Sequence, residues 1–252
     1  MTDFLAQALL LAAGRGERMR PLTDTTPKPL LPVRGKPLMQ WALEGLQRGG
    51  LTDVLINTAW LGEQIPAHFG PCLETPPGPP LQLHYSHEGL DFGGALETAG
   101  GIVRALPRLA DTFWVAAGDV FAPDFVFDPA ALARFQDSAA LAHLWLVPNP
   151  AHNPGGDFGL SQGWALNLPR RAADAPADEL PRYTFSTIAL YKRAFFEAPW
   201  CGVPPGNPAG VKAPLAPMLR AAMDNRAVSA SLYLGAWTDV GTPQRLAELN
   251  KD

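Results

Sequence analysis

The residue types with the clearest potential for chemistry lie in a short run between Gly14 and Lys28. Gly14 and Gly16 can turn their backbone N–H groups toward an anion, because a residue without a Cβ allows tight turns and close approach. Arginines in the run offer planar donors that match phosphate oxygens, and Lys28 offers a compact positive charge. Pro27 and Pro29 restrict the backbone on both sides of Lys28, which is therefore presented from a stiff segment. These features together predict a loop that holds a polyphosphate.

Two widely used phosphate-binding motifs do not describe this loop. The P-loop pattern GxxxxGK followed by serine or threonine is absent from the sequence, and the dinucleotide-binding pattern needs a third glycine where Met19 stands. A surface turn with solvated arginines is the structural alternative. The apolar run before Gly14 and the Pro-Lys-Pro segment favour the phosphate loop over such a turn.

Two aspartates, Asp119 and Asp239, each accompany an apolar segment and a glycine. Asp119 follows the run 113–117 and Gly118, whereas Asp239 lies within the run 237–242. An aspartate in such a position is commonly a turn or helix-cap residue. Phosphoryl transfer, however, needs a hard cation, and Mg²⁺ takes one or two carboxylates together with phosphate oxygens. The two residues are therefore either structural or candidates for a metal site.

Apolar stretches with β character recur along the chain, and helical patterns separate the first of them. The predicted strands span residues 8–12, 54–57, 81–85, 113–117, 141–147, 183–191 and 228–234. Helices are expected from Pro37 to the glycine pair 49–50, over 61–69 and over 97–106. This alternation favours an α/β fold with a mixed, mostly parallel sheet and helices on both faces. Ligands bind beyond the carboxyl ends of such strands, where the Gly14 loop and Asp119 are placed.

Composition and charge indicate a globular protein with one substantial core. The 252 residues are 47% hydrophobic and 17% charged. A formal net charge of −4 argues against a nucleic-acid partner. The two cysteines follow no disulfide or metal-binding pattern, so a cytoplasmic protein is expected. The apolar run 4–13 is too short to span a membrane and lacks the cationic start of a secretion signal.

The run 14–32 resembles the signature of the sugar-1-phosphate nucleotidylyltransferases, GxGxRxxPLTxxxPKPLxP. Glu17 departs from the commonest form, in which threonine stands at this place. The positions that match are Gly14, Gly16, Arg18, Pro21, Leu22, Thr23, Pro27, Lys28, Pro29 and Leu30. The resemblance implies one domain over residues 1–252, with a Rossmann-like fold of the nucleotide-diphospho-sugar transferase type, which is GT-A-like. The nucleotide would bind to about residues 1–125 and the sugar to about residues 126–252.

The resemblance also implies roles for individual residues. Lys28 and Arg18 are the expected catalytic residues. Asp119 and Asp239, far apart in the sequence and close in the fold, are the expected ligands of a Mg²⁺ cofactor. The residues expected to bind the nucleotide are Ala12, Ala13, Gly14, Arg15, Gly16, Glu88, Thr98, Ala99 and Gly100. Those expected to bind the sugar are Asp157, Gly159, Ser186 and Thr187.

The sugar-binding half lacks one motif that is common in the family. Many hexose-1-phosphate enzymes carry a Glu-Lys-Pro triplet there, whose lysine contacts the sugar phosphate. This chain has the run 167–171 (NLPRR) instead, and Arg170, Arg171 or Lys212 stay open as substitutes. The missing triplet, the ETxGG motif at Glu97, the run 57–62 and the short length are most similar to the N-acetylmuramate-1-phosphate uridylyltransferases of cell-wall recycling.

The activity implied by this resemblance is the transfer of UMP from UTP to a sugar 1-phosphate, with release of pyrophosphate. N-acetylmuramate 1-phosphate is the expected acceptor, in peptidoglycan recycling. Mannose-1-phosphate guanylyltransferase and glucose-1-phosphate uridylyl- or thymidylyltransferase activities are the alternatives within the class. A non-catalytic relative that senses nucleotide sugars, and a nucleotide-sugar oxidoreductase, are alternatives of other classes. A monomer or small homo-oligomer without nucleic-acid or membrane partners is expected.

Overall fold

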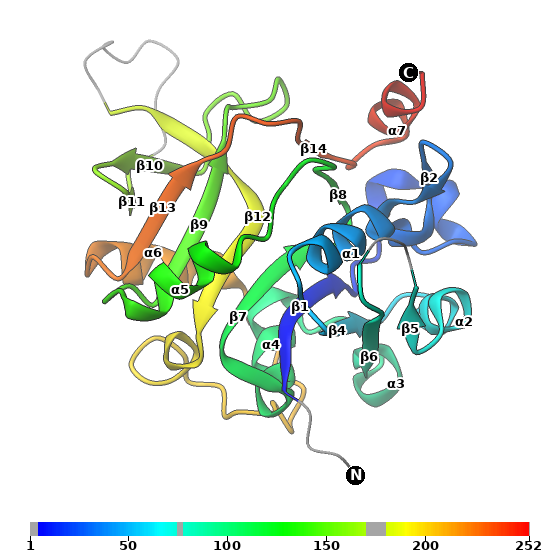
Figure 1. The fold of residues 1–252 in the computed structure, drawn as a ribbon, viewed down its shortest axis with the longest axis horizontal. Coiled ribbons are helices and arrows are strands. Elements are labelled where there is room, and N and C mark those ends of the chain that lie inside the picture. Colours follow the sequence, from blue (N-terminus) through cyan, green and yellow to red (C-terminus); the bar gives the residue numbers. More distant parts are fainter. Residues whose placement is uncertain (1–4, 75–77, 170–179, 252) are drawn as a thin grey trace.

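The computed structural model describes residues 5–74, 78–169 and 180–251, and within these ranges the dominant feature is one ten-stranded sheet (Figure 1). Its strand order is β10-β11-β13-β9-β12-β7-β1-β4-β6-β5. The first half of the chain supplies β1 (Ala6–Ala12), β4 (Asp53–Thr58), β5 (Cys72–Leu73), β6 (Leu81–His87) and β7 (Leu109–Ala117). The second half supplies β9 (Ala142–Val147), β10 (Phe158–Ser161), β11 (Trp164–Leu166), β12 (Arg182–Lys192) and β13 (Val228–Leu232). Each of the seven stretches predicted to be strands overlaps one of these, and five of the observed strands extend beyond the predicted ends.

Parallel pairing is concentrated in the first half of the sheet. β1 runs parallel to β4 and β7, with Leu10 opposite Ile56 and Ala116, and β4 runs parallel to β6. β1 is buried along nearly its whole length, which explains why it is a continuous apolar run. β12 instead runs antiparallel to both β7 and β9. The sheet is therefore mixed, as predicted, and in the second half only β9 and β13 pair in parallel within the described ranges.

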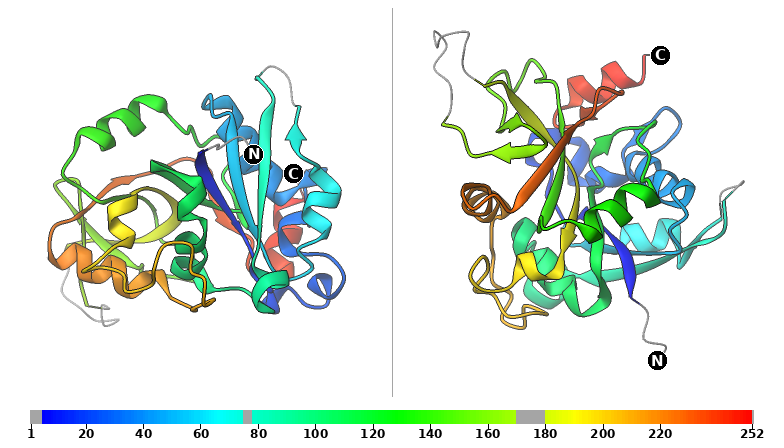
Figure 2. Two further views of the ribbon diagram at one scale, coloured as in Figure 1. Left: turned by 90° about the horizontal axis from the view of Figure 1, so that it is seen from below. Right: turned by 60° about the vertical axis from the view of Figure 1, so that its left-hand side comes forward.

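Helices cover both faces of the sheet, as the alternation of elements predicts (Figure 2). Leu9 and Leu10 of β1 point to opposite faces and belong to different core clusters. α4 (Glu97–Ala105) and α6 (Leu215–Asp224) pack on the Leu9 side, and α1 (Leu38–Arg48) and α5 (Pro129–Asp137) on the Leu10 side. The shorter helices are α2 (Gln64–Phe69), α3 (Glu88–Phe92) and α7 (Pro243–Leu249). Short 3₁₀ turns span Glu17–Met19, Leu22–Asp24, Lys28–Leu30, Leu106–Arg108 and Arg193–Phe196.

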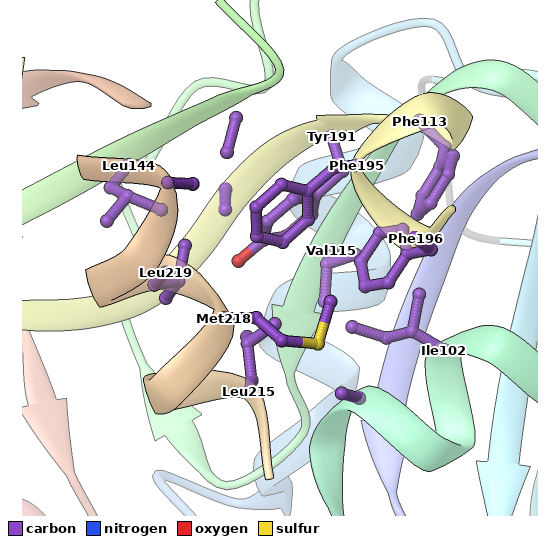
Figure 3. Packing of buried hydrophobic residues seen from close by; sticks show 14 of the residues in the cluster. Ile102, Phe113, Val115, Leu144, Tyr191, Phe195, Phe196, Leu215, Met218 and Leu219 are labelled. Carbon is purple, nitrogen blue, oxygen red and sulfur yellow. The ribbon is translucent and has the colours of Figure 1, made fainter. Parts of the chain in front are cut away.

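An aromatic cluster fixes α6 against the centre of the sheet (Figure 3). Tyr191 of β12 stacks on Phe195 with 5.4 Å between the ring centroids, and Phe113 of β7 stacks on Phe196 at 6.2 Å. Leu219 of α6 belongs to the same buried cluster. Full burial of one such side chain contributes about 2 kcal/mol. The cluster therefore holds α6 and β12 in a defined position relative to β7.

Two short strand pairs lie beside the main sheet. β2 (Pro32–Val33) pairs with β3 (Lys36–Pro37), and β8 (Val120–Phe121) pairs antiparallel with β14 (Thr238–Asp239). The second pair joins the chain just beyond β7 to a segment close to the C-terminal helix α7 (Figure 1). In the part of the chain that the structure describes, no helix is long and apolar enough to cross a membrane.

Candidate functional site

A cavity of about 790 Å³ opens at the carboxyl ends of β1 and β7. The first half of the chain lines it with the glycine loop and the start of α4, and the second half lines it with residues of β10, β12 and α6. Its position agrees with the rule that ligands bind beyond the carboxyl ends of parallel strands. The predicted site residues that line it are Ala12, Ala13, Gly14, Gly16, Arg18, Lys28, Glu88, Thr98, Asp119, Asp157 and Thr187.

The glycine loop is held in a tight turn at Gly16. The φ angle of this residue is +66°, in the left-handed region that favours glycine, and the Thr23 hydroxyl donates to the Gly16 carbonyl at 2.8 Å. A Cβ at position 16 would lie 3.0 Å from the Thr23 Cγ2 atom, tighter than ordinary contacts. The turn therefore depends on glycine for both its backbone angle and its space.

Lys28 and Arg18 both reach the cavity, but they are held differently. Lys28 is only 8% exposed, and its Nζ atom lies 2.6 Å from Oδ2 of Asp119. Arg18 is exposed and forms no hydrogen bond or ion pair with any other residue in the described ranges. Lys28 is thus held by a carboxylate, whereas Arg18 extends from the loop with its guanidinium donors available.

The structure brings the two aspartates together. The β8–β14 pairing places Asp239 opposite Val120, and the Val240 N–H donates to the Asp119 carbonyl at 3.0 Å. Among the described residues no group of three or more His, Cys, Asp or Glu side chains is arranged to hold a metal ion. Asp119 lines the cavity and Asp239 does not, although the backbone pairing places the two residues close together. One or two carboxylates suffice for Mg²⁺, because this ion usually completes its shell with phosphate oxygens and water.

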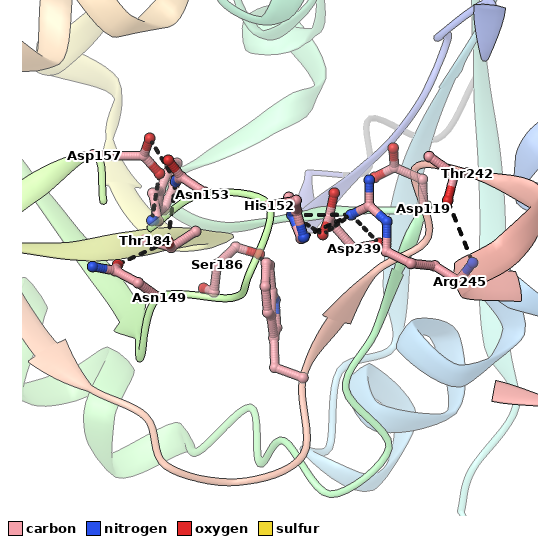
Figure 4. A network of polar contacts seen from close by, with 12 residues as sticks. Asp119, Asn149, His152, Asn153, Asp157, Thr184, Ser186, Asp239, Thr242 and Arg245 are labelled. Carbon is pink, nitrogen blue, oxygen red and sulfur yellow. Dashed lines mark hydrogen bonds and ion pairs between the residues drawn. The ribbon is translucent and has the colours of Figure 1, made fainter. Parts of the chain in front are cut away.

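The Asp239 carboxylate has an arginine and a histidine as neighbours, and the sequence pattern indicated neither (Figure 4). The Nη1 atom of Arg245 lies 2.5 Å from Oδ1 of Asp239, and Nε2 of His152 lies 2.8 Å from the same oxygen. Arg245 comes from α7, whose first turn is capped by the Thr242 hydroxyl. The sequence spacing of these two residues from Asp239 is not typical of any motif. His152 is far from Asp239 in the chain, so only tertiary packing brings the two together.

A buried polar network anchors the end of β1. The Asn57 side chain accepts from the Ala12 N–H at 2.8 Å and donates to Oε1 of Glu88 at 2.7 Å. The other Glu88 oxygen accepts from the Leu96 N–H at 2.9 Å. Burial raises the pKa of the Glu88 carboxyl, and the bonds from Leu96 and Asn57 oppose that rise. Glu88 therefore lines the cavity as a fully buried residue, and Asn57 connects it to the end of β1.

The helix α4 is built around glycines that accommodate its neighbours. A Cβ at Gly101 would lie 2.6 Å from Oε1 of Glu88, and one at Gly100 would lie 2.5 Å from the Val211 carbonyl oxygen. Ala99 is fully buried in the core on the α6 side of the sheet. Of the three residues predicted here, Thr98 alone lines the cavity, whereas Ala99 and Gly100 pack the helix against its surroundings.

Arg15 does not line the cavity, although the sequence predicts it among the nucleotide-binding residues. Its guanidinium carbon lies 3.4 Å from the centroid of the Trp60 ring, and Nη1 donates to the Thr23 carbonyl at 3.0 Å. The Trp60 indole donates to the same carbonyl at 2.9 Å. Arg15 thus ties the glycine loop to the segment after β4, which explains the run 57–62 as a support for the loop.

Of the predicted sugar-binding residues, some line the cavity and others support the backbone around it. Asp157 and Thr187 line the cavity. Ser186 is fully buried and donates to the Trp145 carbonyl at 2.6 Å, next to a break in the β12–β9 register that gives Thr187 a φ of +63°. At Gly159 a Cβ would lie 2.4 Å from a Leu168 methyl carbon. Ser186 and Gly159 therefore shape the backbone around the cavity.

Of the three residues considered as substitutes for the missing lysine, the structure describes Lys212 alone. Lys212 is exposed and does not line the cavity, and Arg170 and Arg171 lie outside the described residues. Arg220 of α6 does line the cavity, and no local sequence pattern indicates it.

Comparisons with known proteins agree on one family. The family model described as "Nucleotidyl transferase" matches residues 7–161. The chain is 44% identical over 249 residues to an N-acetylmuramate alpha-1-phosphate uridylyltransferase of Neisseria meningitidis, with 96% of each protein covered. It is 27% identical over 237 residues to the protein of the same name from Caulobacter vibrioides, covering 79% of this chain and 88% of that one. A Bacillus anthracis protein described as a glucose-1-phosphate thymidylyltransferase in complex with sucrose shares the fold, with a TM-score of 0.72 at 21% identity over 97% of this chain and 93% of that one.

Proposed function

Since the chain belongs to the nucleotidyl transferase family, we propose that it transfers UMP from UTP to N-acetylmuramate 1-phosphate and releases pyrophosphate. The observation that carries the proposal is a single cavity with Lys28 and Asp119 at one end and Asp157 and Thr187 at the other. The 44% identity to an N-acetylmuramate enzyme over nearly the whole length supports the choice of acceptor. The proposal includes a role in cytoplasmic peptidoglycan recycling.

The proposed reaction does not depend on acid–base catalysis. The attacking oxygen belongs to a phosphate that is already ionised at neutral pH, so no general base is required. The obstacle is repulsion between two anions, which a site overcomes by positioning and by neutralising charge. In this proposal Lys28 holds the α-phosphate and the incoming sugar phosphate. Arg18 and the amides of the Gly14 loop hold the departing pyrophosphate.

Asp119 and Asp239 are the residues that would hold Mg²⁺ in this proposal. When bound there, the cation supplies further neutralisation of phosphate charge. Arg245 and His152 hold Oδ1 of Asp239 and so orient its carboxylate. Lys28 is paired with Asp119, and phosphate oxygens compete with this carboxylate for the ammonium. The side chains of Lys28, Asp119 and Asp239 are therefore held by other side chains before substrates bind.

The experiment that tests the proposal measures pyrophosphate release over a grid of substrates. UTP, CTP, GTP and dTTP are combined with the 1-phosphates of N-acetylmuramate, N-acetylglucosamine, glucose and mannose. UTP with N-acetylmuramate 1-phosphate is expected to give the highest kcat/KM. If mannose or glucose 1-phosphate is preferred by about tenfold or more, which corresponds to 1.4 kcal/mol of transition-state binding, the proposed acceptor is wrong. Absence of pyrophosphate release with every pair would refute nucleotidyl transfer itself.

A further inference from the structure

Arg220 is a cationic side chain in the cavity that has no carboxylate partner among the described residues. Its Nη1 atom donates to Oδ1 of Asn167 at 2.8 Å, and its Nη2 atom makes only a long contact of 3.4 Å with the Asp157 carbonyl oxygen. The guanidinium carbon lies 5.1 Å from the centroid of the Phe158 ring, an orienting cation–π contact. These contacts hold the side chain in place and leave its charge without a direct counter-charge.

The nearest carboxylates are engaged elsewhere. The Asp157 side chain accepts from the Phe185 N–H at 2.9 Å and from the Asn153 amide at 3.2 Å (Figure 4). The Asp224 carboxylate accepts from the Asn167 amide at 3.1 and 3.0 Å, so it reaches Arg220 only through Asn167. The cation is therefore oriented by neutral groups, which is the arrangement expected where an anionic ligand supplies the missing charge.

Arg182, which lies near Arg220, has a structural role instead. Arg182 is 9% exposed, and its guanidinium donates to the carbonyls of Gly155, Gly156 and Asp157 at 2.8 to 3.0 Å. It organises the backbone that leads into β10. Arg220 and Arg182 both line a second hollow of about 490 Å³, which the Asp157 and Arg220 side chains share with the main cavity. The sugar end of the site thus has room for a substituent, and Arg220 lies at the border between the two hollows.

Arg220 is also remote from the phosphate end of the cavity. Phe158 lies on β10, which pairs with β12, and β12 is separated from β1 by β7. Three strand spacings correspond to roughly 14 Å across the sheet. A sugar whose 1-phosphate lies beside Lys28 therefore presents a different part of itself to Arg220.

We infer that Arg220 selects the acceptor by binding a carboxylate carried on the sugar ring, an inference that rests on the proposed function. N-acetylmuramate 1-phosphate carries such a group in its lactyl ether, and N-acetylglucosamine 1-phosphate lacks it. A guanidinium binds a carboxylate through two parallel hydrogen bonds, which a neutral substituent does not reproduce. The carboxylate would replace the long contact to Asp157 and neutralise the charge on Arg220.

The test compares Arg220→Met and Arg220→Lys with the unmodified protein on three acceptors and UTP. The acceptors are N-acetylmuramate 1-phosphate, its lactyl methyl ester and N-acetylglucosamine 1-phosphate. Arg220→Met is expected to lower kcat/KM for the carboxylate acceptor roughly 10- to 100-fold. It should change the values for the two acceptors without a free carboxylate by less than about threefold, and Arg220→Lys should recover part of the loss. Arg226→Met is the matched control, because Arg226 lies over the Trp164 ring at 5.2 Å and outside the cavity.

The possible outcomes separate this inference from the proposed function. An equal loss of kcat/KM for all three acceptors would show that Arg220 stabilises the fold or binds the phosphate. An unchanged kcat/KM for the carboxylate acceptor would show that Arg220 does not contact it. Either result overturns the inference. An unmodified protein that does not favour N-acetylmuramate 1-phosphate over N-acetylglucosamine 1-phosphate overturns the proposed acceptor and the inference with it. Thermal unfolding of each variant checks that the compared proteins are equally folded.

Discussion

The Nζ atom of Lys28 lies 2.6 Å from Oδ2 of Asp119, although 91 positions separate the two residues in the chain. Lys28 is 8% exposed, and an ammonium with so little contact with water is favourable only when it is paired. The Asp119 side chain is 42% exposed and keeps one side open to the cavity. The pair therefore holds the lysine at the point where phosphate oxygens are expected, and it links the glycine loop to one of the two proposed Mg²⁺ ligands.

Replacing Lys28 by alanine is expected to lower kcat by about two to three orders of magnitude, because one preorganised charged contact to the reacting phosphates is lost. The fold should persist, since Asp119 is left partly in contact with water. Initial rates with saturating UTP and sugar 1-phosphate measure the effect. Lys212→Ala, at an exposed position outside the cavity, is the control and should retain full activity. A folded Lys28→Ala protein with nearly unchanged kcat would contradict the phosphate role.

Chelation of divalent cations should abolish the activity, and Mg²⁺ or Mn²⁺ should restore it. Asp119→Asn and Asp239→Asn should each raise the Mg²⁺ concentration needed for half-maximal rate by more than about tenfold, the loss seen even when a supporting group is removed. Asp124→Asn, at a nearby exposed position, should leave the Mg²⁺ dependence unchanged. Full turnover in the presence of EDTA would show that the two carboxylates serve another purpose.

Adding one methyl group at Gly101 should damage both stability and nucleotide binding. A Cβ there would lie 2.6 Å from Oε1 of Glu88 and 2.9 Å from the Asn57 amide, so the network that anchors the Ala12 N–H must shift. Overpacking of this kind costs about 1–3 kcal/mol. Urea unfolding and the KM for UTP measure the two effects. The matched control is Gly202→Ala, because a Cβ at that position meets nothing within 4 Å. If Gly101→Ala and Gly202→Ala had the same stability and the same KM for UTP, the Asn57–Glu88 network would have no role in stability or nucleotide binding.

His143 predicts how stability depends on pH. Burial lowers the pKa of this histidine to about 4, with Arg134 lowering it further. Because the unfolded chain binds the proton more readily, the free energy of unfolding should fall as the pH drops from about 6.5 toward 4, by at most about 3 kcal/mol. His143→Gln should flatten this slope in urea unfolding between pH 7 and 5. His68→Gln, at an exposed position, should leave it unchanged. A slope that both variants preserve would assign the acid sensitivity to other groups.

The part of the site whose local conformation the sequence predicts is one continuous segment. Gly14, Gly16 and Lys28 occur together, and their local conformation follows from glycine and proline geometry. The strand that precedes them is also predicted correctly, because β1 is apolar along nearly its whole length. Arg15 shows the limit of such a pattern. Its residue type suits phosphate binding, but the Trp60 ring and the Thr23 carbonyl hold it as a support for the loop.

The parts that the sequence does not predict depend on long-range packing. β14, which carries Asp239, is only two residues long, so neither its length nor its periodicity marks it as a strand. His152 reaches Asp239 from a loop, and Arg220 reaches the cavity from a helix whose apolar face gives no hint of a site. The antiparallel course of β12 beside β7 is likewise set by tertiary pairing. Local patterns describe elements, and the contacts between distant elements complete the site.

The most direct test of nucleotidyl transfer follows the oxygen atoms of the sugar phosphate. The protein is supplied with UTP, Mg²⁺ and N-acetylmuramate 1-phosphate labelled with ¹⁸O in its phosphate, and the products are analysed by ³¹P NMR and mass spectrometry. Attack of the sugar phosphate on the α-phosphate predicts that all of the label enters UDP-N-acetylmuramate, including the bridging oxygen, and that the released pyrophosphate carries none. Labelled pyrophosphate, or the absence of any labelled nucleotide sugar, would contradict the account.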